Sequence, residues 1–108
     1  MGKDPKISLQ TLKLLRAMLD HPADEFYGRE LGAETGLASG TLYPVLNRLE
    51  NAGWLTSHWE KLDPRVAGRP PRRLYRLTGA GETAARAACD EHLRPLLRPL
   101  PQPRGSFA

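Results

Sequence analysis

The segment from Ser39 to Asn51 constrains the fold more than any other part of the chain. Its large apolar residues recur at intervals of three and four, which is the spacing of one buried stripe on an amphipathic helix. They are Leu42, Val45, Leu46 and Leu49. A helix of this length gains most of its stability from packing, so the stripe must lie against other elements and leave the opposite face outside.

Pro44 restricts where this helix can begin. Proline lacks an N–H and disrupts a helix interior, but it is tolerated in the first turn, where the N–H groups have no partner in the helix. The sequence therefore predicts a helix start at about Gly40 or Thr41. The amides from Ser39 to Thr41 would then form a seat for a phosphate.

The residues outside the stripe are polar or flat, and Glu50 is the only acid among them. Arginine and asparagine can pair with guanine and adenine edges, and small polar residues suit a phosphate backbone. The net charge of +4 also suits a polyanionic partner without establishing one. We interpret this face as a surface that enters a groove of double-stranded DNA, with a solvated polar face as the alternative. The candidate contacts on the helix are Ser39, Thr41, Tyr43, Pro44, Asn47 and Arg48.

Two shorter segments precede this helix. Ser8 can cap a first helix with a leucine-rich face, which Pro22 ends. Residues 24–27 are expected to be a brief extended link, followed by a short helix over Gly28–Thr35 with Leu31 and Ala33 inward. Gly36 then supplies a tight turn. A short helix, a glycine turn and a helix with an apolar stripe form the helix-turn-helix pattern.

After the helix, Trp54–Glu60 and Arg73–Leu77 alternate in the manner of half-buried strands. Residues 61–71 are expected to be irregular, because prolines and a glycine interrupt them. The two strands and this loop predict a β-hairpin, or wing. Its basic side chains could grip the DNA backbone or simply be solvated. The candidate contacts in the wing are Arg69, Arg72 and Arg73.

Thr78 can cap a last helix whose small residues would allow a second helix to approach closely. The predicted fold is mainly α with a small β-hairpin: a winged helix-turn-helix with a three-helix core, a wing and a C-terminal dimerisation helix. We divide the chain into an arm (1–7), a DNA-binding domain (8–78), a dimerisation helix (79–94) and a proline-rich flexible tail (95–108). The expected dimer contacts are Leu9, Leu12, Ala84, Ala88 and Leu93.

Other classes of protein have less support in the sequence. One cysteine excludes an internal disulfide, and no apolar run approaches the length of a membrane span. We therefore expect a cytoplasmic protein with no membrane partner. The histidines are scattered and no catalytic arrangement is visible, so neither an enzyme nor a cofactor is expected. Cys89 and His92 share a helical face and could contribute to a metal site, although two ligands alone are weak support.

The motifs as a whole resemble the PadR family of bacterial winged-helix transcription regulators. The family pattern matches Leu42-Tyr43-Pro44, Leu46, Arg48-Leu49-Glu50 and Gly53, then Trp59-Glu60, Gly68, Arg72-Arg73, Tyr75, Leu77-Thr78 and Gly81, with Tyr27-Gly28 before the second helix. The resemblance covers about residues 8 to 90 and is closest to the compact subfamily without a separate dimerisation domain.

The resemblance implies a homodimeric repressor that binds a pseudo-palindromic operator. Some compact members hold flat aromatic ligands with a tryptophan of the last helix, which this chain lacks, so a small-molecule effector is left open. Two alternatives remain at this point. One is a metal-responsive repressor of the arsenic-repressor type that uses Cys89 and His92, and the other is a winged helix used for protein contacts.

Overall fold

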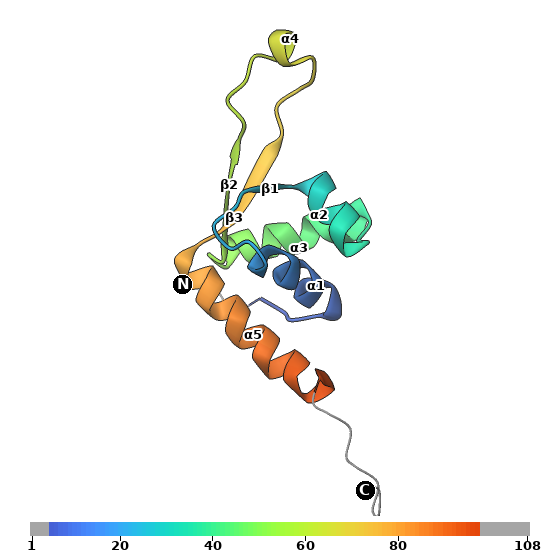
Figure 1. Ribbon diagram of the computed structural model, residues 1–108, viewed down its shortest axis with the longest axis vertical. Coiled ribbons are helices and arrows are strands. Elements are labelled where there is room, and N and C mark those ends of the chain that lie inside the picture. The colour runs from blue at the N-terminus through green and yellow to red at the C-terminus, as the bar shows by residue number, and fades with distance from the viewer. Residues whose placement is uncertain (1–4, 98–108) are drawn as a thin grey trace, which may run out of the picture.

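Helices and a small sheet surround a leucine-rich core in the computed structural model, which describes residues 5–97 (Figure 1). No helix in that range is long and apolar enough to cross a lipid bilayer. The elements are α1 (Leu9–Leu19), β1 (Phe26–Tyr27), α2 (Gly28–Thr35), α3 (Ser39–Asn51), β2 (Leu55–Trp59), α4 (Pro64–Ala67), β3 (Arg73–Leu77) and α5 (Gly79–Leu97).

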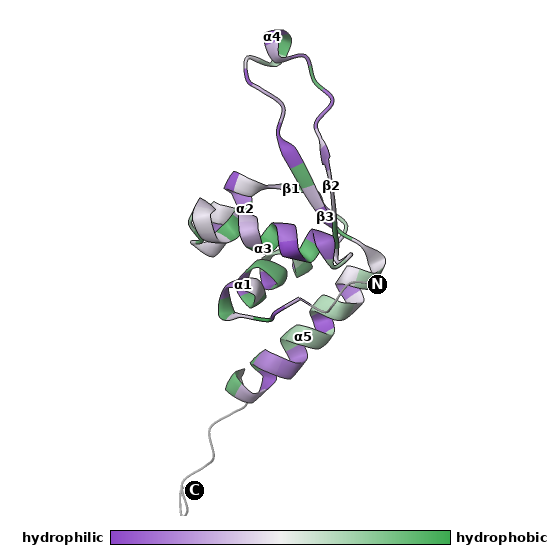
Figure 2. Ribbon diagram, turned by 180° about the vertical axis from the view of Figure 1, so that it is seen from behind, coloured by the Kyte–Doolittle hydropathy of each residue, from purple (hydrophilic) through white to green (hydrophobic). Residues whose placement is uncertain are grey.

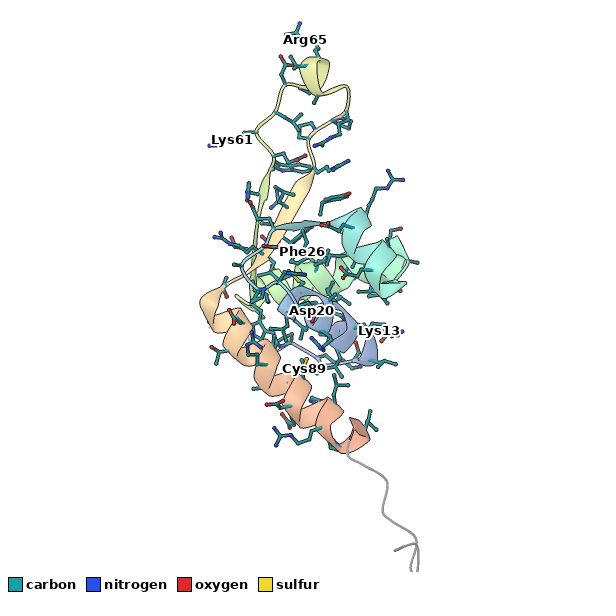
Figure 3. All side chains as sticks on the ribbon, viewed as in Figure 1. Lys13, Asp20, Phe26, Lys61, Arg65 and Cys89 are labelled. Atoms are coloured by element: carbon teal, nitrogen blue, oxygen red, sulfur yellow. The ribbon has the colours of Figure 1, made fainter. Side chains whose placement is uncertain are left out.

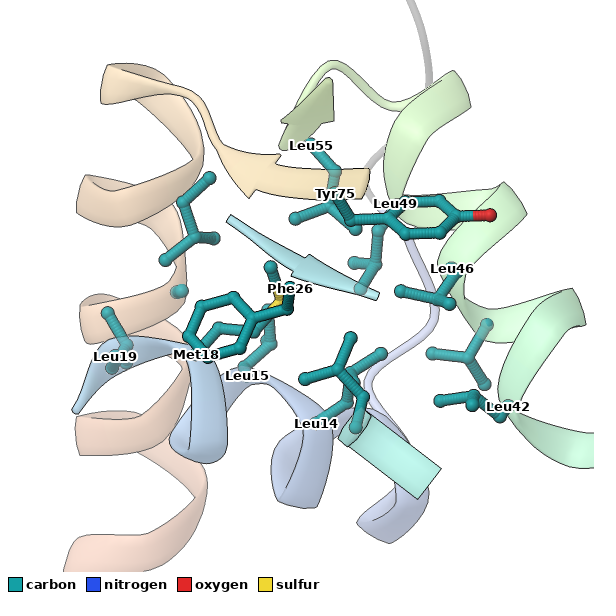
Figure 4. Packing of buried hydrophobic residues seen from close by; sticks show 14 residues of the cluster. Leu14, Leu15, Met18, Leu19, Phe26, Leu42, Leu46, Leu49, Leu55 and Tyr75 are labelled. Carbon is teal, nitrogen blue, oxygen red and sulfur yellow. The ribbon is translucent and has the colours of Figure 1, made fainter. Parts of the chain in front are cut away.

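Helix α1 contributes buried side chains to one side of the hydrophobic core. Its N-terminus is capped as predicted, because the Ser8 Oγ accepts a hydrogen bond of 3.1 Å from the Thr11 amide. Leu14, Leu15 and Met18 are fully buried between the other helices and the sheet (Figure 4). Leu9, at the start of the helix, is 60% exposed.

The apolar stripe of α3 packs into this core as predicted. Leu42, Val45, Leu46 and Leu49 are each at most 2% exposed. The helix begins at Ser39, however, so Pro44 lies in the second turn and the predicted start at Gly40 or Thr41 is wrong. The acceptor that loses a partner is the carbonyl four residues earlier, at Gly40. Gly40 is exposed, so water can bond that carbonyl and the proline is tolerated.

The sheet has three antiparallel strands in the order β1-β3-β2. The predicted hairpin is present, with Ser57 opposite Tyr75. The segment expected to be only an extended link adds a third strand, because Phe26 pairs with Tyr75 and enters the core at 6% exposure. Ala33 of α2 was expected to face inward but is exposed.

The wing loop, expected to be irregular, contains the single turn α4 at its tip (Figure 1). The Asp63 carboxylate accepts from the Arg65 amide at 2.9 Å, and Pro64 occupies the first helical position. Gly68 ends the turn with a left-handed φ of 71°. Proline and glycine therefore stand at the two ends of the helical turn, where they favour it, rather than within it.

Helix α5 packs along α1 and places Ala85 in the core. Thr78 caps it as predicted, with its Oγ1 accepting from the Gly81 amide at 2.8 Å. The helix continues to Leu97, so the predicted end at residue 94 is wrong and Pro95 lies inside the helix. The acceptor that Pro95 leaves free belongs to exposed Glu91. Residues 1–4 of the predicted arm and 98–108 of the predicted tail lie outside the described residues.

Two glycines of the first turn of α5 give a matched test of this packing. A Cβ at Gly81 would lie within 2.6 Å of the Trp54 carbonyl carbon, whereas a Cβ at Gly79 would meet no atom within 4 Å. Gly81→Ala should therefore lower the free energy of unfolding by about 1–3 kcal/mol through overpacking. Gly79→Ala should leave it unchanged or raise it, because alanine favours helix. Urea denaturation measures both, and equal stabilities for the two variants would contradict this packing.

Candidate nucleic-acid interface

The outer face of α3 is open to solvent, opposite the leucine stripe. Tyr43, Pro44, Asn47 and Arg48 lie on this face, and all four are exposed. Ser39 and Thr41, nearer the N-terminus of the helix, are exposed as well. The structure therefore brings together on one helix the six side chains that the sequence proposed as its DNA contacts. Whether they contact DNA remains a prediction.

Tyr43 combines exposure with a fixed position. It is 43% exposed, yet its ring lies so close to Gly28 of α2 that a Cβ there would be 2.7 Å from the ring carbon Cε1. Only glycine leaves room for this approach. Tyr43 thus links α2 to α3 and presents its hydroxyl at the junction between them.

Glu50, the one acid outside the apolar stripe, connects α3 to the sheet. Its Oε2 accepts a hydrogen bond of 2.6 Å from the Ser57 hydroxyl and lies 3.9 Å from Nη2 of Arg73. Arg73 in turn donates from Nε to the Ser57 hydroxyl at 3.0 Å. This small network holds the C-terminal end of α3 against β2 and β3.

A second carboxylate organises the base of the wing. The Arg69 guanidinium donates to both oxygens of Glu60, at 2.7 and 3.1 Å, and the Arg72 amide donates to Oε1 of Glu60 at 2.9 Å. The hydrogen bond from Arg69 lowers the pKa of Glu60 to about 2, and that from Arg72 adds to the effect. Glu60 therefore stays ionised and ties the two arms of the wing together.

The three wing arginines proposed from the sequence differ in their surroundings. Arg69 pairs with Glu60, and Arg73 pairs with Glu50 and lies 5.3 Å from the centre of the Trp59 ring. Arg72 instead stacks 4.2 Å above the Tyr27 ring. Ion pairs with Glu60 and Glu50 thus partly occupy two of the three proposed contacts.

Other basic side chains are freer than these three. Lys61, Arg65 and Arg76 are exposed (Figure 3). The Arg65 side chain at the wing tip lies 3.8 Å from Asp63, yet it is 93% exposed, so water screens this ion pair strongly. Arg29 of α2 is also exposed and borders the outer face of α3, although it was absent from the proposed contacts. Its position directly after Tyr27-Gly28, at the start of the second helix, was the signal that could have identified it.

The aromatic residues of the hairpin divide between surface and core. Trp59 is 59% exposed beside Arg73, because the wing extends beyond the body at this point. Tyr75 is buried, at 8% exposure. Trp54 is half-buried and packs against the core.

The side chains expected at a dimer contact also divide into two groups. Leu12 and Ala88 are only 7% exposed within the subunit, so they offer little surface to a partner. Leu9 is exposed, and Ala84 and Leu93 are half-buried. Leu96 adds an exposed apolar side chain on α5. Figure 2 shows apolar and polar residues alternating along α5, whose C-terminal turns extend beyond the body.

Cys89 and His92 do not form a metal centre with other residues of the described range. No cluster of three histidine, cysteine, aspartate or glutamate side chains that could hold a metal ion occurs within residues 5–97. Cys89 is half-buried, and burial raises the pKa of its thiol, which disfavours the metal-binding thiolate.

Comparison with known proteins shows to which family the chain is similar. The model of the transcriptional regulator PadR-like family matches residues 27–87. The transcriptional regulator Rv3488 of Mycobacterium tuberculosis is 39% identical over an alignment of 89 positions that covers 74% of this chain and 78% of the relative.

Solved structures share the fold. The smu.1704 protein of Streptococcus mutans superposes with a TM-score of 0.62 at 25% identity, covering 84% of this chain and 82% of that one. AbfR of Staphylococcus epidermidis has a TM-score of 0.65 at 23% identity, over 89% of this chain and 57% of its own length. An overoxidised form of AbfR bound to DNA has also been solved, with a TM-score of 0.62 at 24% identity over 78% of this chain and 56% of that one.

The pairing of Arg69 with Glu60 predicts how the wing base responds to pH. The pKa of Glu60 is about 2 in the fold against 4.5 without these partners. The stabilisation is therefore complete above about pH 4.5 and is lost as the pH falls toward 2. Carboxyl carbon NMR measures this titration directly. Arg69→Gln should raise the pKa of Glu60 toward 4.5, while the wing-tip control Arg65→Gln should not change it. Titration near 4.5 in the unmodified protein would contradict the pairing.

Proposed function

The chain belongs to the PadR-like family of DNA-binding transcriptional regulators, and on that premise we propose that it acts as a dimeric repressor at an inverted-repeat operator. The observation that carries the proposal is the two-sided character of α3. The four side chains of its apolar stripe are each at most 2% exposed, while the opposite side of the helix is exposed, polar and basic. Such a face can enter a major groove without disturbing the core.

The proposal assigns different tasks to the residues of that face. Arg48 and Asn47 read base edges, because their side chains can form paired hydrogen bonds with guanine and adenine. Pro44 and the ring of Tyr43 contact sugars and thymine methyl groups. Ser39 and Thr41, near the N-terminus of α3, contact phosphate oxygens.

The wing supplies affinity that depends on salt and little on sequence. Exposed Lys61, Arg65 and Arg76 carry most of this role, with Arg65 at the tip extending toward a flanking minor groove. Arg69 acts chiefly by joining the two arms of the wing through Glu60, and Arg73 by holding the wing against α3 through Glu50. This division revises the expectation that Arg69, Arg72 and Arg73 all serve as direct DNA contacts.

Two copies would meet through α1 and α5. Leu9, Ala84, Leu93 and Leu96 retain apolar surface on these helices, and they are the contacts we propose. A two-fold dimer presents two α3 helices to successive major grooves on one side of the duplex, which requires an inverted repeat. Such a dimer would occlude a promoter and repress transcription. We place the protein in the cytoplasm, where bacterial regulators reach their DNA.

Selection of bound sequences from a random DNA pool tests the proposal. The unmodified protein should enrich an inverted repeat with half-site centres about one helical turn apart. Enrichment of a single unpaired half-site would contradict the dimer, and recovery of sequences without any preference would contradict specific regulation.

Arg48→Ala tests the base-reading role on the selected site. This variant should lose about 1–3 kcal/mol of specific binding free energy and relax the preference at one base pair of each half-site. Fluorescence anisotropy measures the affinity, and Arg86→Ala is the control, because Arg86 lies on α5 and pairs with Glu82 at 3.0 Å. If Arg48→Ala binds the selected and random DNA as the control does, Arg48 does not read bases.

A further inference from the structure

A small basic cleft lies between the outer face of α3 and the base of the wing. It has a volume of about 160 Å³ and is lined by Tyr27, Gly28, Arg29, Tyr43, Arg72 and Arg73. These residues come from β1, α2, α3, β3 and the wing residue just before β3, so the fold brings together positions that are far apart in the sequence. None of the six is acidic.

The charges in and around the cleft are unequally compensated. Arg69 and Arg73 have carboxylate partners, Glu60 and Glu50. Within residues 5–97, no carboxylate lies within ion-pair distance of Arg72 or Arg29. The Arg72 side chain therefore has no ion pair of its own, and the nearest compensating acid is Glu60, whose carboxylate accepts from the Arg72 amide.

Arg72 is nevertheless held in place. Its guanidinium stacks 4.2 Å above the Tyr27 ring, and its amide donates to Glu60 at 2.9 Å. Stacking on a ring leaves the edge of the guanidinium, with its N–H donors, available to an anion. A donor group fixed in advance loses little conformational entropy on binding.

The opposite wall of the cleft, formed by Tyr43, is also fixed in position. Tyr43 packs over Gly28 so closely that any other residue at position 28 would displace the ring. None of the side-chain hydrogen bonds of the described residues involves the Tyr43 hydroxyl, so its O–H can donate to an anion. The cleft thus offers a guanidinium edge, a phenol and the exposed Arg29.

The position of the cleft between α3 and the wing indicates which anion it would bind. If α3 enters a major groove and the wing covers the flanking minor groove, the DNA strand that separates the two grooves passes over the wing base. We infer that this cleft seats one phosphate of the operator backbone, bound by Arg72 with Arg29 and the Tyr43 hydroxyl. This contact positions α3 in its groove, and the inference rests on the proposed function.

The test compares Arg72→Gln with Arg86→Gln on the selected site and on random DNA. Arg72→Gln should weaken binding to both DNAs by the same factor. It should also reduce the slope of log affinity against log salt by about 0.9 per subunit, because one fewer phosphate is neutralised. Arg72→Lys, which keeps the charge, should retain most of the slope, and Arg86→Gln should match the unmodified protein.

Neutral methylphosphonate linkages, placed one at a time along the site, identify the phosphate itself. One position per half-site should weaken binding of the unmodified protein and have no effect on Arg72→Gln. An unchanged salt slope in Arg72→Gln, or equal losses in both proteins at every position, would overturn the inference. If Arg72→Gln does not fold by circular dichroism, Tyr43→Phe, which keeps the ring over Gly28, decides by the same scan. The proposed function fails separately, if the unmodified protein shows no base preference.

Discussion

The burial of one side of α3 is the interaction on which the rest of the structure depends. Four apolar side chains, Leu42, Val45, Leu46 and Leu49, are withdrawn from water by α1 and the sheet. At roughly 1.5–3 kcal/mol for each fully buried side chain, this stripe contributes a large part of the stability of a small domain. Because a helix cannot turn its apolar side inward without turning the other side outward, the same packing exposes Asn47 and Arg48.

The wing depends on electrostatics rather than on apolar burial. Glu60 joins its two arms through Arg69 and the Arg72 amide, and Glu50 joins it to α3 through Ser57 and Arg73. Two of the three wing arginines that the sequence proposed as DNA contacts, Arg69 and Arg73, are therefore structural. The charge left for a polyanion is concentrated at Arg72 in the cleft and at exposed side chains such as Lys61.

Local patterns predicted much of this fold, and they failed where tertiary contacts decide. The sequence predicted the helix α3, the caps at Ser8 and Thr78, and the hairpin, because each depends on a local residue pattern. Strand β1 was missed, since two residues become a strand only when β3 lies beside them. The helix bounds predicted from Pro44 and Pro95 were wrong, because an exposed carbonyl that loses its helical hydrogen bond to a proline can bond water instead. The outer face of α3 followed from its period, whereas the partners of Arg69, Arg72 and Arg73 required the folded chain.

An NMR titration of isotope-labelled protein with its selected DNA site tests the central claim most directly. The account predicts that the largest shifts occur at exposed Asn47 and Arg48 of α3 and at the wing base, while the methyl groups of buried Leu46 and Leu49 change little. Shifts confined to α5, with the outer face of α3 unchanged at saturation, would contradict it.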